Sequence, residues 1–248
     1  MLPGPTPATH SRDLLTWARE LWAALAGGAE GFVPGTAKVV VSPASGISPP
    51  RWSAVVVLGD AALVTVPDES TAERMLRVLP RTTIDRLTDS DGLPALLPVA
   101  GVLGPAALFY LDPSAPGPSG ESRDVRRRPR GDAGLAALLA RSGETDADES
   151  AMEDITSPAF VQYLDGEVVA AAGYRTWPWS VAHLSVLVDP RCRNEGRARA
   201  VAAAAVRHAL DAGLRPQWRA RSVPSQHVAR SLGFQRLGAQ LSLLPADG

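Results

Sequence analysis

The chain has 248 residues, of which 45% are hydrophobic and 21% are charged, the composition of an ordinary soluble globular protein with one large or two small domains. The formal net charge of -1 argues against a protein whose whole surface grips nucleic acid, and the single cysteine excludes a disulfide framework and a four-thiolate metal site. No apolar run approaches the roughly 20 residues that a membrane span needs, and the N-terminus does not resemble a secretory signal. We therefore expect a cytoplasmic protein that is not bound to membranes.

The first part of the chain predicts a smaller α/β domain over residues 1–111, in which we find no chemical motif. Apolar residues from Leu14 to Leu25 recur at helical spacing, and Asp60 separates two apolar runs, which favours a hairpin. The expected elements are a helix at 14–25, strands at 38–41, 54–58 and 61–66, a helix from about 69 to 79, and strands at 99–103 and 106–111.

Residues 112–124 read DPSAPGPSGESRD, which predicts a linker because proline, glycine and serine dominate and almost nothing can be buried. A second domain is expected over 125–248. Asp165-Gly166 indicates a tight hairpin turn, and Ser225 can cap a helix. The expected elements are strands at 125–128, 160–164, 167–176, 181–188, 217–220 and 239–244, and helices at about 132–141, 196–212 and 225–231.

One loop carries a pattern that suits a bound anion. Arg193-x-x-Gly196-x-Ala198 lies between a predicted strand and a predicted helix, where unsatisfied backbone N–H groups point outward. Gly196 allows a close approach of the backbone, and Ala198 allows close helix packing. Charge is added by Arg191, Arg193, Arg197 and Arg199. Together these features favour a pyrophosphate site.

This loop, the alanine-rich helix after it and the segment Ser222–Phe234 (SVPSQHVARSLGF) together resemble the GNAT superfamily of N-acetyltransferases, over about residues 125–244. The resemblance implies an α/β fold with a mixed central sheet flanked by helices. It also implies acetyl-CoA as co-substrate, no metal, and direct transfer of the acetyl group to a primary amine in a ternary complex. The acceptor is then a small molecule or a peptide, not a nucleic acid, and the protein is a monomer or a homodimer.

By the same resemblance, acetyl-CoA lies in a V-shaped opening between the strands at 181–188 and 217–220. The backbone of the first strand pairs with the pantetheine arm, and the loop holds the pyrophosphate. The residues that the resemblance assigns to acetyl-CoA are Leu187, Val188, Arg193, Asn194, Glu195, Gly196, Arg197, Ala198 and Ser222.

Two family residues are missing at their expected positions. The tyrosine that many members use as general acid falls at Ala229, and the glutamate that some use as general base falls at Ala182. His183 is a candidate base, or else a strand histidine with a structural partner. Ser231 is a candidate donor to the leaving thiol, or else a solvated helix serine. The two alanines also leave open a non-catalytic acyl-CoA-binding or sensor module.

Several other features have two interpretations each. Cys192 lies between two arginines, which favours a reactive thiolate, but no base is adjacent and we expect a bystander. The acidic stretch 144–154 either attracts a cationic amine or is a solvated loop. Trp177-Pro178-Trp179 either walls the acceptor site or packs against the first domain. The basic run 123–130 resembles a nucleic-acid patch, but a first strand is favoured. The first domain either completes the acceptor site or is a degenerate second copy of the fold.

Overall fold

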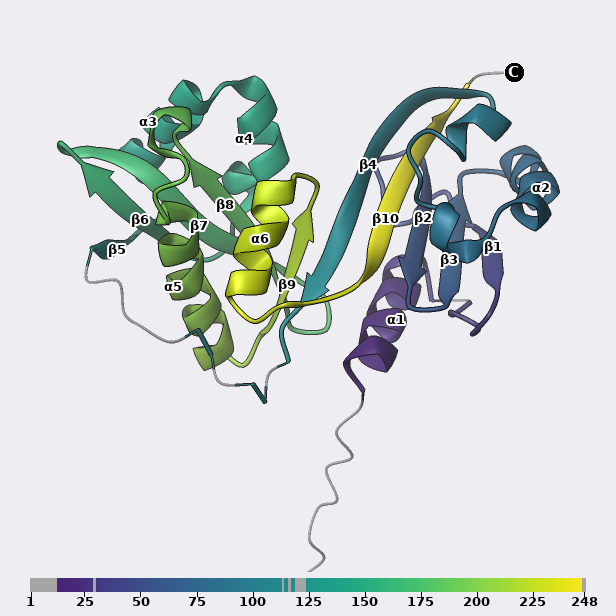
Figure 1. Cartoon of the computed structure of the whole chain (residues 1–248), viewed down its shortest axis with the longest axis horizontal. Coiled ribbons are helices and arrows are strands. Elements are labelled where there is room, and N and C mark those ends of the chain that lie inside the picture. Colours follow the sequence, from purple (N-terminus) through teal and green to yellow (C-terminus); the bar gives the residue numbers. More distant parts are fainter. Residues whose placement is uncertain (1–12, 29, 113, 116, 119–123, 247–248) are drawn as a thin grey trace, which may run out of the picture. The chain divides into compact units, whose positions relative to one another are not determined.

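The computed structural model describes residues 13–28, 30–112, 114–115, 117–118 and 124–246 (Figure 1). The chain forms two compact units, one from Met1–Leu103 with Leu241–Gly248 and the other from Gly104–Gln240. Two strands, β4 (Val99–Tyr110) and β10 (Gln235–Pro245), contribute residues to both units. Among the described residues, no helix is long and apolar enough to cross a membrane.

The first unit is built on a hairpin buried on both faces. Strands β2 (Ser53–Leu58) and β3 (Ala61–Val66) are antiparallel, and β1 (Ala37–Val41) pairs with β3 in parallel. Every residue of β2 and β3 is buried, so both faces are covered. Helix α2 (Glu69–Val78) contacts β1 and β3, and α1 (Leu14–Leu25) contacts β2.

Polar contacts fix both helices of this unit. Arg19 Nη2 of α1 donates to Leu58 O at 2.8 Å and pairs with the Asp60 carboxylate at 2.6 Å, which ties the helix to the hairpin turn. Asp68 caps α2 by accepting a hydrogen bond from Thr71 N at 2.8 Å. Short 3-10 turns at Leu79–Arg81, Ile84–Arg86 and Pro94–Leu96 then lead to β4. The expected helices and strands of this α/β unit are confirmed up to this point.

The second unit has a mixed sheet with the strand order β4-β9-β8-β7-β6-β5. Only β8 and β9 pair in parallel, and the other neighbours whose register is known are antiparallel. Its elements are β5 (Val125–Arg128), α3 (Ala133–Ser142), α4 (Glu144–Ser150), the 3-10 turn η4 (Met152–Asp154), β6 (Ala159–Leu164), β7 (Glu167–Trp177), β8 (Val181–Val188), the 3-10 turn η5 (Pro190–Cys192), α5 (Arg197–Asp211), β9 (Arg215–Ala220) and α6 (Val223–Ser231).

Helices cover both faces of this sheet (Figure 1). On one face, Leu184 of β8 and Trp218 of β9 pack in an apolar cluster with the alanine-rich α5 and with Ala229 of α6. On the other face, Leu187 of β8 packs with Leu138 of α3 and with the segment around η4. Odd-numbered residues of β8 therefore face α3 and α4, and even-numbered ones face α5 and α6. The expected mixed sheet flanked by helices is confirmed.

Several boundaries differ from the sequence-based expectation. The two strands expected at 99–103 and 106–111 are one strand, β4, which continues through Gly104, where glycine adopts φ 110° without strain. The acidic stretch expected as a loop forms α4 and η4, since Glu144 and Asp146 lie in the first turn of α4, where negative charge is favourable. The last strand begins at Gln235, four residues earlier than expected.

The division into units also differs from the expected boundary at 112–124. Residues 107–110 of β4 pair with β9, so the second unit begins before the proline-rich segment and includes it. Residues 241–248, expected in the second domain, belong to the first unit, where Leu241 and Leu243 join its apolar core. Residues 113, 116 and 119–123 of the expected linker lie outside the described residues.

Candidate functional site

The parallel strands β8 and β9 separate part-way along their length. Val181–His183 pair with Arg215–Gln217, and among the described residues no further pair joins these strands. β8 nevertheless continues to Val188 and stays paired with β7. This divergence matches the expected V-shaped opening. It leaves one backbone edge of β8, at Leu187 and Val188, without a β9 partner, and an extended chain with amide groups can add to such an edge.

The turn after β8 is anchored by the carboxylate of Asp189, whose side chain is 1% exposed. This carboxylate accepts hydrogen bonds from Arg191 Nε at 3.0 Å, Arg191 Nη2 at 2.8 Å and Arg141 Nε of α3 at 3.3 Å. The bonds from Arg191 hold the pKa of Asp189 well below its usual range. Asp189 N also donates to Val169 O at 2.9 Å. These contacts fix where the turn leaves the sheet.

Gly196 ends the turn as the N-cap of α5, with φ 75° and ψ 1°. Glycine adopts this left-handed conformation without strain, and a Cβ built there would meet nothing within 4 Å. In the described part of the chain no side chain caps α5, and its first turn holds no acidic residue. The N–H groups of Arg197, Ala198 and Arg199 precede the first helical hydrogen bond, which Ala200 N donates, and are therefore open to an anion from outside, as the sequence expectation requires.

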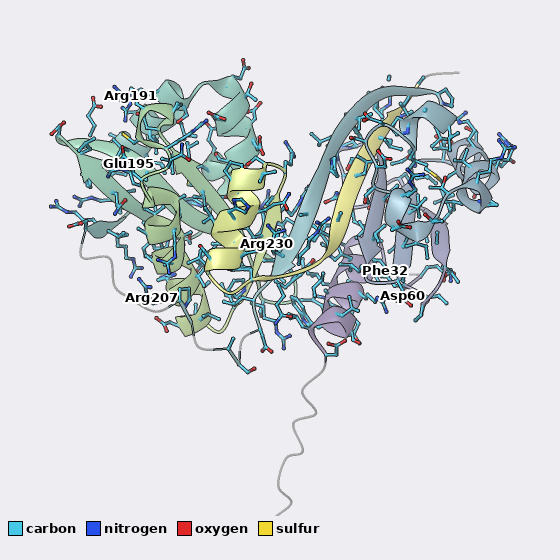
Figure 2. All side chains as sticks on the ribbon, in the orientation of Figure 1. Phe32, Asp60, Arg191, Glu195, Arg207 and Arg230 are labelled. Atoms are coloured by element: carbon cyan, nitrogen blue, oxygen red, sulfur yellow. The ribbon has the colours of Figure 1, made fainter. Side chains whose placement is uncertain are left out.

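The arginines of the loop supply less free charge than expected. Arg191 is held by Asp189, and Arg193 pairs with Asp146 of α4. Arg197 Nε pairs with the Glu195 carboxylate at 2.8 Å. Figure 2 shows Arg191 and Glu195 at the end of the unit where α5 begins. Backbone N–H groups, more than free guanidinium groups, are thus the donors that this loop offers.

Helix α6 begins earlier than expected, and the hydroxyl groups of its serines already take part in hydrogen bonds. Its N-cap is Ser222, whose side chain accepts from Ser225 N at 3.4 Å, so Ser225 is not the cap. Ser225 Oγ instead accepts from Trp218 Nε1 at 3.0 Å. Ser231 is exposed, and its hydroxyl donates to Val228 O at 2.8 Å. Ser231 must give up this bond before it can donate a proton to a thiolate.

His183 lies at the point where β8 and β9 separate. Its Nδ1 is 2.5 Å from Gln217 Oε1, so Nδ1 carries the proton and Nε2 presents a lone pair. Trp177 stacks on the imidazole, with ring centroids 4.3 Å apart and planes at 17°. Burial, and to a smaller extent the positive charge of Arg219, lower the pKa of His183 to about 3. The imidazole is therefore neutral at physiological pH.

This shift predicts a pH dependence of stability. The unfolded chain protonates His183 near its ordinary pKa of 6.5, whereas the folded protein does so only near 3. The folded state therefore loses stability as the pH falls below 6.5, by about 3 kcal/mol at pH 4.5. In urea unfolding at pH 7 and pH 4.5, His183→Asn should lose less stability on acidification than the wild type. An identical loss in both proteins would contradict a depressed pKa.

The structure bears on two flanking features that have two interpretations each. Cys192 is buried, 6% exposed, because η5 turns it inward while Arg191 points outward, so it is not a reactive surface thiol. The acidic segment is partly neutralised, since Asp154 pairs with Arg175 at 3.4 Å in addition to the pair between Asp146 and Arg193.

Among the described residues, no group of three or more His, Cys, Asp and Glu side chains could hold a metal ion.

Three residues of the site were not singled out from the sequence. Asp189 anchors the turn, and Gln217 orients His183. Arg219 follows Gln217 on the same face of β9. The available signal was the alternation in this strand, RPQWRA, in which polar side chains interrupt a sequence expected to be buried. Burial and hydrogen bonding, which only the fold reveals, give these residues their significance.

Comparison with known proteins places this geometry in a family. A model described as GNAT acetyltransferase matches residues 159–239. No curated protein matches the chain. Similar solved structures include a protein described as an acetyltransferase of the GNAT family from Novosphingobium aromaticivorans DSM 12444, 20% identical with a TM-score of 0.47, for which the match covers 58% of this chain and 65% of that one.

Two further solved structures resemble the chain at similar levels. A GCN5-related N-acetyltransferase from Kribbella flavida is 19% identical with a TM-score of 0.46, and the match covers 60% of each chain. A GCN5-related N-acetyltransferase-like protein from Streptococcus suis 89/1591 is 16% identical with a TM-score of 0.48, covering 95% of this chain and 94% of that one. This chain thus spans less than two thirds of the matched protein from Novosphingobium and of that from Kribbella. The family match falls on the strands and helices that build the diverging β8–β9 pair and the turn before α5, and the C-terminal part of this chain therefore contains a GNAT acetyltransferase domain.

Proposed function

We propose that this chain is an N-acetyltransferase that moves the acetyl group of acetyl-CoA directly to a primary amine of a small molecule or peptide within a ternary complex. One observation supports the proposal above the others. The β8–β9 pairing ends at His183 and Gln217, and β8 then leads into a turn whose helix offers uncapped N–H groups. An edge for an amide-containing arm and a site for its phosphates thus lie at successive positions along the chain.

The residues of the turn fit a pyrophosphate in two respects. Gly196 presents no side chain, and open space lies where its Cβ would be. The first turn of α5 carries Arg197 and Arg199 and no acidic residue. Positive side chains are unfavourable at the positive end of a helix dipole unless an anion binds there. In our proposal the N–H groups of Gly196, Arg197 and Ala198 hold the phosphates.

The proposed reaction is a direct transfer, so it needs no covalent intermediate with the protein. The amine nitrogen attacks the thioester carbonyl carbon, so a C–N bond forms as the C–S bond breaks. The amine loses one proton and the departing thiolate gains one. Binding both reactants in one site supplies much of the acceleration. In our proposal the amine proton leaves through water at Nε2 of His183, which with a pKa of about 3 relays the proton to solvent and does not retain it at neutral pH, and Ser231 is the donor to the thiolate. Ala182 and Ala229 are both fully buried in the apolar cluster under α5, so neither position supplies a group.

A direct assay tests the proposal. The full chain is incubated with acetyl-CoA and a panel of primary amines, and N-acetylated product is measured by mass spectrometry alongside acetyl-CoA affinity by calorimetry. We expect binding of acetyl-CoA and formation of product from at least one class of amine. Tight binding without product from any amine would instead indicate a non-catalytic acyl-CoA-binding module. Absence of binding would refute both functions.

A further inference from the structure

Arg219 and Gln217 share one face of β9. Along this strand they alternate with Trp218 and Ala220, which belong to the apolar cluster packed against α5 and α6. Successive strand residues point to opposite faces, so Arg219 and Gln217 point away from α5 and α6. Gln217 pairs with His183 at the last register position shared by β8 and β9. Arg219 therefore lies just beyond the point where the two strands separate.

The guanidinium of Arg219 has no anionic partner among the described residues. Five other arginines of this unit do have one: Arg141 and Arg191 with Asp189, Arg175 with Asp154, Arg193 with Asp146, and Arg197 with Glu195. Arg219 is partly buried, and burial together with the charge of Arg221 lowers the pKa of its guanidinium to about 10. A desolvated cation without a carboxylate is unfavourable, so an anion supplied from outside would be bound well.

Gln217 adds a second donor beside this cation. Its side chain is fully buried, and its Nε2 has no hydrogen-bond partner in the described part of the chain. The amide cannot turn freely, because Oε1 accepts the Nδ1 proton of His183 at 2.5 Å. A buried amide donor that is held in place without an acceptor implies that a ligand or a water molecule accepts its hydrogen bond. The two unused donors are thus a guanidinium and an amide N–H, two residues apart on one face of β9.

We propose that Arg219 and Gln217 bind a carboxylate of the acceptor, so that the substrates of this domain are amines that also carry a carboxylate, as α-amino acids do. This inference rests on the proposed acetyltransferase function. The phosphates of acetyl-CoA are assigned to the start of α5, which covers the opposite face of the sheet, so they do not account for a cation on this face. A carboxylate has two oxygens and can accept from both donors at once. The neutral imidazole of His183 is hydrogen-bonded to Gln217 and is therefore next to these donors.

The test compares amino acids with the amines that lack only the carboxylate, namely leucine with isoamylamine and phenylalanine with phenethylamine. We expect kcat/KM of the wild type to favour the amino acid by about 100-fold, because a site with unfilled polar donors rejects a ligand that cannot fill them. Arg219→Met keeps an unbranched stem without the charge, and it should remove this preference while lowering kcat/KM for the plain amines far less. Arg236→Met, at an exposed arginine of β10, is the control that should keep it.

Equilibrium binding of the products separates this inference from the proposed function. N-acetylleucine and N-isoamylacetamide are titrated by calorimetry, which requires no turnover, and acetyl-CoA affinity and thermal unfolding are measured for each variant. Selective binding of the N-acetyl amino acid, lost in Arg219→Met with acetyl-CoA affinity unchanged, supports the proposal. An equal loss for both members of a pair, or a wild type that prefers neither, overturns it even if plain amines are acetylated. Failure of acetyl-CoA to bind refutes the function, while the product titration still decides on the carboxylate.

Discussion

Gly196→Glu should abolish acetyl-CoA binding, with a loss of affinity of more than about 100-fold. A side chain at this position would project into space where no atom lies within 4 Å, beside the uncapped N–H groups of α5. The new carboxylate would occupy the positive end of the helix dipole itself and would repel the phosphates. Calorimetry with acetyl-CoA measures the loss, and circular dichroism checks that the variant is folded.

The chain offers a matched control at the other end of the same helix. Gly213 has φ 71° and, like Gly196, open space around its absent Cβ, so Gly213→Glu introduces the same strain and the same charge. This variant should bind acetyl-CoA as the wild type does. Gly196→Ala separates strain from charge, because it adds a Cβ at φ 75° without a carboxylate, and it should weaken binding only modestly. Unchanged affinity in Gly196→Glu would show that the cofactor does not bind at this turn.

The elements around this turn could be predicted from the sequence because local signals agree there. An apolar run from Val181 to Val188, a proline that ends it and an alanine-rich segment closed by Gly213 specify strand, turn and helix within one residue of the structure. The resemblance to a known family added the order of these elements. Gly196 was predicted to allow close approach of an anion, and its left-handed φ gives that expectation a physical basis.

Contacts between distant residues could not be predicted in this way. The composition of the loop suggested four free arginines, but three of them have carboxylate partners, and the partners of Arg191 and Arg193 include residues of β7 and α4. The inward orientation of Cys192 depends on a single 3-10 turn that the sequence pattern does not specify. Residues 241–248 belong to the first unit because of long-range strand pairing, for which no local signal exists in the sequence.

The second large effect is expected at Asp189. Asp189→Asn keeps the shape of the side chain but removes the charge that holds Arg191 and Arg141. The lost ion pair with Arg191 contributes little to the change in stability, because the Arg191 side chain is 65% exposed and is readily hydrated. Arg141 is 28% exposed and is left partly buried without its nearest carboxylate, so this partner dominates the cost. We expect the free energy of unfolding to fall by about 2–4 kcal/mol in urea denaturation at pH 7.

The pH dependence distinguishes a lost ion pair from a merely misfolded turn. The pKa of Asp189 is depressed in the folded protein, so its stabilising contribution is complete well above pH 3.8 and is lost as the pH falls below that value. The difference in stability between wild type and Asp189→Asn should therefore be large at pH 7 and shrink as the pH falls below 4. Asp165→Asn, at an exposed hairpin position where asparagine also tolerates φ 50°, is the matched control and should change stability little. A difference that stays constant from pH 7 to pH 3 would mean that the carboxylate charge is not what fixes the turn.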